Sequence, residues 1–251
     1  MQDWMGCEIR REAEIDSTNR AARAWARTGA PSGAVVVAAR QTAGRGRMQR
    51  HWESPAGTGL YLSAVVRPEM PLERFPCLTF AAAMAACDAC RALGAHTRIK
   101  WPNDLVLDGR KVAGILLERE GNAAVIGIGI NARQNITDFP EELREKAGSL
   151  EMLTGKSFEL SALERELIRA LESRVEQAIA GDWREDYRTL CATLGSRVRV
   201  IGTDETFEGV AEDMDETGAL LVRDGEGTLR RVLAGDVSVR GMMGYADRDR
   251  D

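Results

Sequence analysis

The sequence predicts an α/β domain followed by a small all-β domain. Up to residue 194, short apolar runs of strand length alternate with longer helical stretches, whereas only short alternating segments separated by turns follow Gly195. The chain has 251 residues, which at ~150 residues per domain leaves room for one sizeable domain and a smaller one. We therefore expect domains over residues 1–194 and 195–251.

The first domain is expected to alternate between strands and helices. Short apolar runs, rich in β-branched residues, predict strands at residues 34–39, 60–66, 98–101, 105–107, 112–117 and 123–130. Longer stretches with helical composition or period predict helices at residues 20–27, 75–93, 160–179 and 183–194. A polar loop over residues 41–54 separates the first two strands.

Turn and capping residues support these boundaries. Ser17-Thr18-Asn19 offers capping side chains just before the first helix, and Gly29 and Gly94 follow the ends of the first two helices. Residues 108–111 read Asp-Gly-Arg-Lys between two apolar runs, which is a strong hairpin signal. We expect a turn there.

The second domain is expected to be a small β-barrel. Its predicted strands are residues 197–201, 206–211, 219–222, 228–233 and 237–239. The charged residues 247–251 are expected to form a frayed tail.

Composition excludes several functional classes. The formal net charge is −5, with 34 Lys and Arg against 39 Asp and Glu, so a uniformly basic nucleic-acid binder is excluded and any positive site is local. The first residues lack the basic start and apolar core of a secretory signal, and no run of ~18 apolar residues occurs. We expect a cytoplasmic protein with no membrane segment.

Five cysteines without an export signal predict reduced thiols. Cys87 and Cys90 have the C-x-x-C spacing of a redox or metal pair, but they lie in an alanine-rich stretch and no second cysteine pair exists. His51 and His96 are the only histidines. The sequence therefore favours two core cysteines on a helix over a zinc site.

Two nucleotide-binding motifs are incomplete. Residues 154–157 read Thr-Gly-Lys-Ser, like the end of a P-loop, but Leu150 stands where that motif needs glycine. Residues 127–132 fit the G-x-G-x-x-A dinucleotide fingerprint, yet the polar, proline-containing residues 135–140 do not open the long helix that would bind a pyrophosphate. We expect a turn between helices at the first motif and a closely approached strand at the second.

Residues 40–50 reverse the sign of the charge locally. This stretch holds four arginines and no acidic residue, with glycines that let the backbone bend around an anion. Guanidinium groups suit phosphates and carboxylates, and Trp52 could stack on a flat base. The alternative is a solvated basic loop, which the loop by itself does not exclude.

Six motifs follow one another along the chain. They are Ser17-Thr18-Asn19, residues 41–47 with Arg50 and Trp52, Gly57 with residues 59–63, Lys100-Trp101-Pro102-Asn103-Asp104-Leu105, residues 111–116, and residues 127–131. Together they closely resemble the biotin protein ligases. The likeness is strong over residues 15–131, and residues 197–240 resemble the small carboxy-terminal domain of that family.

The resemblance implies a catalytic domain with a mixed β-sheet packed by helices, and an SH3-like barrel after it. It also implies that biotin and MgATP form biotinyl-5′-AMP and pyrophosphate, and that a lysine of a biotin carboxyl carrier domain then takes the biotinyl group. ATP and Mg²⁺ are the expected cofactors, with biotin as substrate. Because Ser17 comes so early, we expect no helix-turn-helix domain and no DNA binding, and a homodimer stays open.

The same resemblance assigns roles to individual residues. Lys111 and Arg47 are the expected catalytic residues, because joining a carboxylate to a phosphate needs fixed positive charge. The expected biotin contacts are Ser17, Thr18, Asn19, Gln41, Gly44, Arg45, Lys111, Gly114 and Gly127. The expected ATP contacts are Arg47, Arg50, Trp52, Lys100, Asn103 and Asn131, and Asp104 is the expected metal ligand.

Several of these residues also have a purely structural explanation. Ser17 and Thr18 could serve only as helix caps. Lys111 could be an exposed turn lysine, and Asn103 with Asp104 could only form a turn. The glycines could reflect tight strand packing alone, and the tryptophan before the proline of the fourth motif is expected in the core.

One departure from the family concerns the arginine-rich loop. The family pattern is Gly-Arg-Gly-Arg-x-Gly-Arg, and Met48-Gln49 replaces the x-Gly pair here. The arginines are retained, but the missing glycine changes the expected flexibility of the loop and its ability to shield an adenylate from water.

Two other functions stay open at this point. A lipoate or octanoyl ligase or transferase would share the superfamily fold, although the arginine-rich loop together with residues 100–104 argues against it. A non-catalytic sensor of biotinyl-adenylate would need only the pocket. Lys111 and the three loop arginines argue against a sensor.

Overall fold

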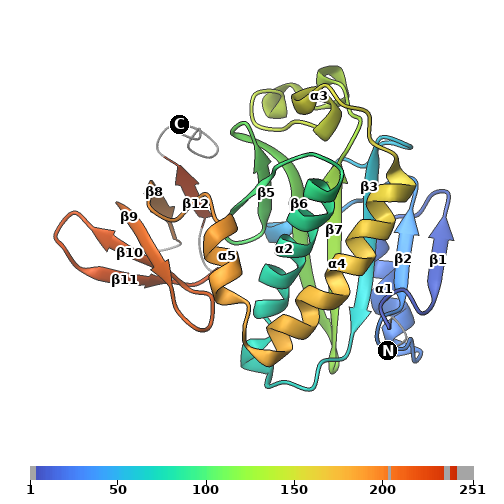
Figure 1. Ribbon diagram of the computed structural model, residues 1–251, viewed down its shortest axis with the longest axis horizontal. Helices are drawn as coiled ribbons and strands as arrows, with labels where there is room; N and C mark the ends of the chain where they lie inside the picture. The colour runs from blue at the N-terminus through green and yellow to red at the C-terminus, as the bar shows by residue number, and fades with distance from the viewer. Residues whose placement is uncertain (1–3, 203–204, 235–237, 242–251) are drawn as a thin grey trace.

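The computed structural model describes residues 4–202, 205–234 and 238–241, the last four through their backbone alone. A seven-stranded sheet has the order β1-β2-β3-β7-β6-β5-β4 (Figure 1). Strand β1 runs parallel to β2 and every other neighbouring pair is antiparallel, so the expected mixed sheet is confirmed. The strands are β1 (Ile9–Glu12), β2 (Val35–Ala38), β3 (Gly59–Val66), β4 (Arg98–Lys100), β5 (Asp104–Leu107), β6 (Arg110–Glu120) and β7 (Ala123–Asn131).

Helices cover both faces of this sheet. The long helices α2 (Cys77–Ala92) and α4 (Leu160–Ala180) lie side by side on one face (Figure 1). Helix α1 (Thr18–Arg27) packs on the opposite face. Two shorter helices are α3 (Leu150–Thr154) and α5 (Arg184–Leu190).

Successive side chains of a strand point to opposite faces of the sheet, which explains why helices cover both faces. In β2, Val35 and Val37 belong to the large core beneath α2 and α4, whereas Val36 packs with Ala22 and Trp25 of α1. Because both faces are covered, the central strands read as continuous apolar runs rather than as alternating ones. The sequence showed this pattern.

The same alternation creates a hollow on the α1 side of the sheet. In β7, Val125 packs with α1, and the next positions on that face are Gly127 and Gly129. Because neither glycine has a side chain, the side chains of Asn19 and Trp52 lie directly against the sheet at this point. The functional site lies there.

A second, five-stranded sheet follows (Figure 1). Its order is β11-β10-β9-β8-β12 and all its pairs are antiparallel, which confirms the all-β prediction. The strands are β8 (Arg197–Ile201), β9 (Thr206–Met214), β10 (Leu220–Asp224), β11 (Leu229–Val232) and β12 (Ser238–Gly241). It is joined to the first sheet by Trp101, whose Nε1 donates to Gly218 O at 3.0 Å, and by the Arg188–Asp213 ion pair at 2.7 Å.

Three expectations about elements need correction. The helix expected to residue 194 ends at Leu190, because Ala192 N donates to Ile99 O and so joins the chain to β4. The expected turn over residues 108–111 occupies only Asp108 and Gly109, and β6 begins at the next residue. Strand β1 was missed because three of its four residues are exposed and charged, which leaves no apolar pattern.

Other expectations hold within the described residues. The turn between helices at residues 154–157 is confirmed, since α3 ends at Thr154 and α4 begins at Leu160. The expected start of the last strand at Val237 and the expected tail over residues 247–251 lie outside the described residues.

The cysteine prediction is also confirmed. Cys87 and Cys90 are free, fully buried thiols on α2. Burial raises the pKa of Cys87 to about 12 and raises that of Cys90 as well, so both remain protonated.

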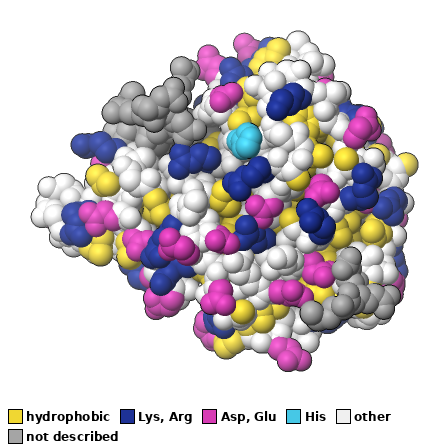
Figure 2. Space-filling model, viewed as in Figure 1, with side chains coloured by type: hydrophobic (Ala, Val, Ile, Leu, Met, Phe, Trp, Pro, Cys, Tyr) yellow, Lys and Arg dark blue, Asp and Glu magenta, His cyan; other side chains and the backbone are white. Residues whose placement is uncertain are grey.

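The surface has no uniform charge. Basic and acidic side chains are interspersed over the face shown in Figure 2, as a net charge of −5 with 34 basic residues predicts. Among the described residues, no helix has the length and apolarity needed to cross a membrane.

Candidate active site

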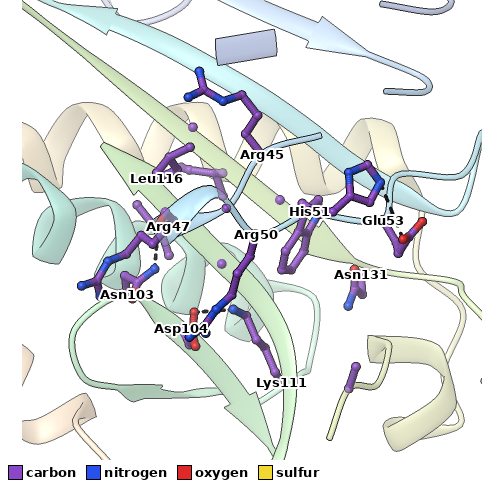
Figure 3. Close-up of a pocket in the computed structure, with 18 of the residues that line it drawn as sticks. Arg45, Arg47, Arg50, His51, Glu53, Asn103, Asp104, Lys111, Leu116 and Asn131 are labelled. Atoms are coloured by element: carbon purple, nitrogen blue, oxygen red, sulfur yellow. Dashed lines mark hydrogen bonds and ion pairs between the residues drawn. The ribbon is translucent and has the colours of Figure 1, made fainter. Parts of the chain in front are cut away.

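A cavity of about 480 Å³ opens on the α1 side of the sheet (Figure 3). Strands β6 and β7, the arginine-rich loop (residues 41–54) and the segment 139–147 line it. This volume is in the range of sites that enclose a drug-sized ligand. Every site residue expected from the sequence lines the cavity except Gly44.

Glycines make room for Trp52 on the cavity floor. Gly114 of β6 pairs with Gly129 of β7. A Cβ on Gly129 would lie 2.5 Å from Trp52 Nε1, and one on Gly114 would lie 3.1 Å from the Trp52 ring. Gly44 has the same function behind the loop, because its Cβ would lie 2.3 Å from the carbonyl oxygen of Trp52. The indole N–H is buried and has no hydrogen-bond partner among the described residues.

Neutral polar groups gather at one end of the cavity. The backbone N and Oγ1 of Thr18 both donate to Gln41 Oε1, at 2.8 and 3.0 Å. Ser63 Oγ lies 2.6 Å from Asn19 Oδ1 and 2.8 Å from Thr18 Oγ1. A Cβ on Gly127 would lie 2.0 Å from Asn19 Oδ1, so a side chain approaches this glycine, whereas the sequence predicted approach by a ligand or another backbone.

Helix capping does not account for the residues that begin α1. Ser17 occupies the N-cap position, yet its side chain makes no capping hydrogen bond. The hydroxyl of Thr18 is bonded to Gln41 across the cavity instead. Both residues are buried. Their side chains therefore serve the cavity rather than the helix end.

Positive charge gathers at the other end. The lining includes six basic side chains and two carboxylates: Arg45, Arg47, Arg50, Lys100, Lys111 and Lys146 against Glu53 and Asp104. Of the six, Arg45 lies with the neutral groups instead, because its partner Glu118 also accepts a hydrogen bond from Asn19 Nδ2. Lys111 Nζ lies 2.6 Å from Asp104 Oδ1 and 5.2 Å from the centroid of the Trp52 ring (Figure 3). Its side chain is 25% exposed, and Lys111 is part of β6, so it is not an exposed turn lysine.

Arg47 is held on two sides. Its Nη1 donates to Asn103 Oδ1 at 2.9 Å (Figure 3). Its Nη2 donates to the carbonyl oxygen of Ala234, which follows strand β11. Asn103 is itself buried and donates from Nδ2 to Ile115 O at 2.7 Å, so it does more than form a turn. Burial lowers the pKa of Arg47, but a guanidinium stays charged near neutral pH.

The arginine-rich loop is folded over the cavity. The Arg45 guanidinium lies 3.0 Å from Glu118 on β6, and Gly46 N donates to Arg50 O. Met48 and Gln49 have φ values of 54° and 59°, in the left-handed region that favours glycine. Gln49, which replaces the glycine of the family pattern, and its neighbour Met48 therefore both adopt a strained backbone.

Sequence reasoning missed part of the lining. The missed residues are Gly46, Met48, His51, Glu53, Trp101, Pro102, Ile115, Leu116, Ile128, Gly129, Phe139, Leu143, Lys146 and Ala147. Most are sequence neighbours of expected residues, so adjacency could have found them. Trp101 is 2% exposed and belongs to the core, as expected, although it also borders the cavity.

The segment 139–147 carried no sequence signal. It reaches the site because it pairs with β6: Lys111 N donates to Lys146 O at 2.8 Å, and Gly148 N donates to Lys111 O at 3.0 Å. Long-range pairing of this kind cannot be read from local periodicity.

Comparison with known families agrees with this geometry. Residues 13–135 match the Biotin/lipoate A/B protein ligase family, and residues 193–240 match the Biotin protein ligase C terminal domain. The biotin–[acetyl-CoA-carboxylase] ligase of Mycobacterium tuberculosis is 37% identical over 239 residues, which are 90% of this chain and 86% of that protein.

Solved structures show the same fold. The biotin protein ligase of Aquifex aeolicus in complex with biotin and ATP has a TM-score of 0.83 and 27% identity, covering 94% of this chain and 99% of that one. The biotin protein ligase of Leishmania major in complex with biotinyl-5-AMP has a TM-score of 0.63 and 27% identity, covering 91% and 99%.

The fold and site define an ATP-dependent ligase with a mixed-sheet domain and an SH3-like carboxy-terminal sheet. The chain belongs to the biotin protein ligase family.

Proposed function

We propose that the cavity binds biotin at its neutral polar end and ATP at its charged end. The activity is that of biotin protein ligases: biotin is activated as biotinyl-5′-AMP, and the biotinyl group then passes to a lysine of a carrier domain. The observation that carries this division is the separation, within one cavity, of the Thr18–Gln41 hydrogen bonds from the Lys111–Asp104 pair.

Biotin needs neutral donors and acceptors for its ureido ring and an apolar surface for its rings and chain. Hydroxyl and amide groups of α1 and the loop supply the former, and the Trp52 ring, which lies against Gly114 and Gly129, supplies apolar surface. Arg45, whose partner Glu118 also accepts a hydrogen bond from Asn19 Nδ2, lines this part of the cavity. The proposed biotin contacts are Ser17, Thr18, Asn19, Gln41, Arg45, Lys111, Gly114 and Gly127, with Gly44 supporting Trp52 from behind.

The first step joins two anions, so fixed positive charge is the main requirement. A carboxylate oxygen of biotin attacks the α-phosphorus of ATP, and pyrophosphate leaves. We assign Lys111 to the carboxylate and α-phosphate, since its Nζ lies on β6 between Asp104, at 2.6 Å, and the Trp52 ring, at 5.2 Å. Arg47, Arg50 and Lys100 neutralise the phosphates from the loop and from β4.

The second step transfers the acyl group. The carrier's lysine amine attacks the biotinyl carbonyl carbon, and AMP leaves with the bonding electron pair. Asn103, Asn131 and Trp52 are the remaining proposed nucleotide contacts, and the buried indole N–H of Trp52 offers a donor to the ligand.

The residues fit a magnesium ion that arrives with ATP. Mg²⁺ is usually held by one or two carboxylates together with substrate phosphates. Asp104 supplies one carboxylate beside the phosphate-binding cations, and the described residues contain no group of three or more His, Cys, Asp or Glu side chains that could hold an ion by themselves. Asp104 would therefore share the ion with phosphate oxygens, and the ion would neutralise charge on the leaving pyrophosphate.

Transfer to a purified carrier domain tests this function. We expect the wild-type chain with biotin and MgATP to biotinylate the carrier lysine, detected by mass spectrometry. Tightly held biotinyl-adenylate without any transfer would instead identify a sensor. The acceptor we propose is the carrier domain of a biotin-dependent carboxylase, as the name of the mycobacterial relative indicates.

Four further expectations remain proposals. We propose a boundary at residues 194–196 between the two domains, supported by the separate sheets on either side. A cytoplasmic location is supported by five free thiols. Absence of DNA binding is checked by gel shift, and a homodimer by sedimentation velocity.

A further inference from the structure

A buried glutamine stands behind the proposed nucleotide site. Gln134 is 2% exposed and follows β7 by three residues. Its Nε2 donates to Asn131 Oδ1 at 3.2 Å and lies 3.5 Å from the hydroxyl of Tyr61. Its backbone carbonyl accepts a hydrogen bond from Ser149 Oγ at 2.7 Å. Gln134 does not itself line the cavity.

These contacts fix the amide of Asn131. The Oδ1 of Asn131 accepts from Gln134, and its Nδ2 donates to Gly148 O at 3.2 Å. An amide can rotate by half a turn at little steric cost, so only its partners decide which end is oxygen. With both partners in place, Asn131 presents one defined set of donors and acceptors to the cavity that it lines.

A buried glutamine with an unpaired amide oxygen is not expected at a position that serves only packing. The Oε1 of Gln134 is buried and has no hydrogen-bond partner among the described residues. A buried, unsatisfied acceptor destabilises a fold, and an apolar side chain of similar size would avoid that cost. A glutamine at this position is therefore best explained by the hydrogen bond from its Nε2 to Asn131 Oδ1.

We propose that Gln134 is a positioning residue that orients Asn131 for binding ATP. This inference rests on the proposed function, in which Asn131 contacts the nucleotide. The network continues through Tyr61, whose hydroxyl donates to Pro55 O at 3.1 Å beside the arginine-rich loop. Gln134 thus connects the nucleotide site to Pro55 and Ser149, which follow the two segments that enclose it.

The variant Gln134→Met separates positioning from folding. Asn131 borders the cavity and Tyr61 keeps its bond to Pro55, so neither loses its last partner. We expect an unchanged or higher melting temperature, a KM for ATP raised about 10-fold in pyrophosphate exchange, and a KM for biotin within about 2-fold of wild type. A lower melting temperature with both KM values unchanged would show a structural role and overturn the proposal.

The matched control is Gln177→Met on α4. Gln177 likewise uses its amide in hydrogen bonds, to the charged side chains of Arg174 and Asp186, and it lies outside the cavity. We expect this variant to lose stability and to keep both KM values. If it raised the KM for ATP as Gln134→Met does, the effect would not be specific and the proposal would fail.

A second variant keeps the proposal testable if the methionine variant does not fold. Gln134→Glu can donate to Asn131 only while its carboxyl group is protonated. Relative to wild type, its KM for ATP should therefore rise as pH rises. A ratio of KM values that does not change with pH would contradict positioning by an N–H donor.

Asn131→Ala distinguishes failure of the proposed function from failure of the inference about Gln134. If it leaves the KM for ATP unchanged, the assignment of Asn131 to the nucleotide is wrong. If it raises the KM for ATP and Gln134→Met does not, the assignment stands and only the inference about Gln134 is wrong.

Discussion

The absence of a Cβ atom at two glycines determines the shape of this site. The two glycines of β7 that face the cavity, Gly127 and Gly129, leave no room for a methyl group, because Asn19 and Trp52 occupy those positions. Sequence reasoning gave two explanations for these glycines, ligand approach and tight packing. The structure shows that protein side chains approach them, and these side chains in turn shape the ligand's pocket.

Gly129→Ala should displace the Trp52 indole. We expect biotin or ATP binding to weaken by about 10- to 100-fold, since overpacking costs about 1–3 kcal/mol, and isothermal titration calorimetry measures this. Gly225→Ala is the matched control, because its added methyl group meets nothing within 4 Å. Equal affinities for the Gly129 variant and the control would show that Trp52 does not need its present position.

Lys111→Ala tests the charge argument at one residue. Removing the ammonium group leaves the two reacting anions without their nearest proposed cation, so adenylate formation should fall about 10²- to 10³-fold. The melting temperature should change little, because the side chain is partly exposed and its partner Asp104 borders the cavity. Biotin-dependent pyrophosphate exchange is the measurement. An exchange rate equal to that of the wild type would show that Lys111 is not a catalytic residue.

At the scale of elements, the arginine-rich loop carries both charge and strain. Left-handed backbone costs a non-glycine residue roughly 1 kcal/mol, and two consecutive residues, Met48 and Gln49, adopt it. The loop keeps this shape because of its ties to Glu118, Asn103 and Ala234.

Gln49→Gly should make this loop more mobile. The glycine relieves the local strain but allows many more open conformations. We expect trypsin to cleave after Arg47 or Arg50 several-fold faster, and biotinyl-adenylate to escape into solution faster. Gln49→Asn is the control, since asparagine tolerates the left-handed region without adding freedom. If glycine and asparagine variants behave alike, residue 49 does not control loop opening.

The elements themselves could largely be predicted from the sequence. Most central strands and the long helices are visible as apolar runs because the sheet is buried on both faces. Strand β1 and the segment 139–147 could not be predicted, since they are placed by pairing with distant strands rather than by their own pattern. The site residues came from motif resemblance, whereas Gln134, three residues beyond the last motif, is recognisable only from burial and hydrogen bonds.

At the scale of the whole molecule, the two sheets meet around an aromatic cluster. The ring of Phe80 stacks on Trp183 at 4.8 Å and meets Tyr187 edge-on, and Gly218, between β9 and β10, approaches Phe80 so closely that a Cβ would lie 1.9 Å from its ring. Arg47 bonds to the carbonyl of Ala234. The arginine-rich loop is therefore tied to the carboxy-terminal part of the chain.

Buried thiols make the stability of the whole fold sensitive to alkali. Burial raises the pKa of Cys87 from 9.0 to about 12, so the unfolded chain releases this proton at a lower pH than the folded chain does. The free energy of unfolding should fall between pH 9 and 12 by about 1.4 kcal/mol per pH unit for each such thiol. Urea denaturation at pH 8 and pH 10 measures this.

Cys87→Ala is the control for that measurement. It should lower stability at pH 8 but show a smaller loss between pH 8 and pH 10. An identical pH dependence in both proteins would show that this thiol is not the cause.

The central claim is that this cavity activates biotin with ATP. Exchange of labelled pyrophosphate into ATP measures the first step directly, with biotin, lipoate and octanoate compared at equal concentrations. We predict exchange with biotin and none with the other two acids. Exchange with lipoate alone would contradict the claim.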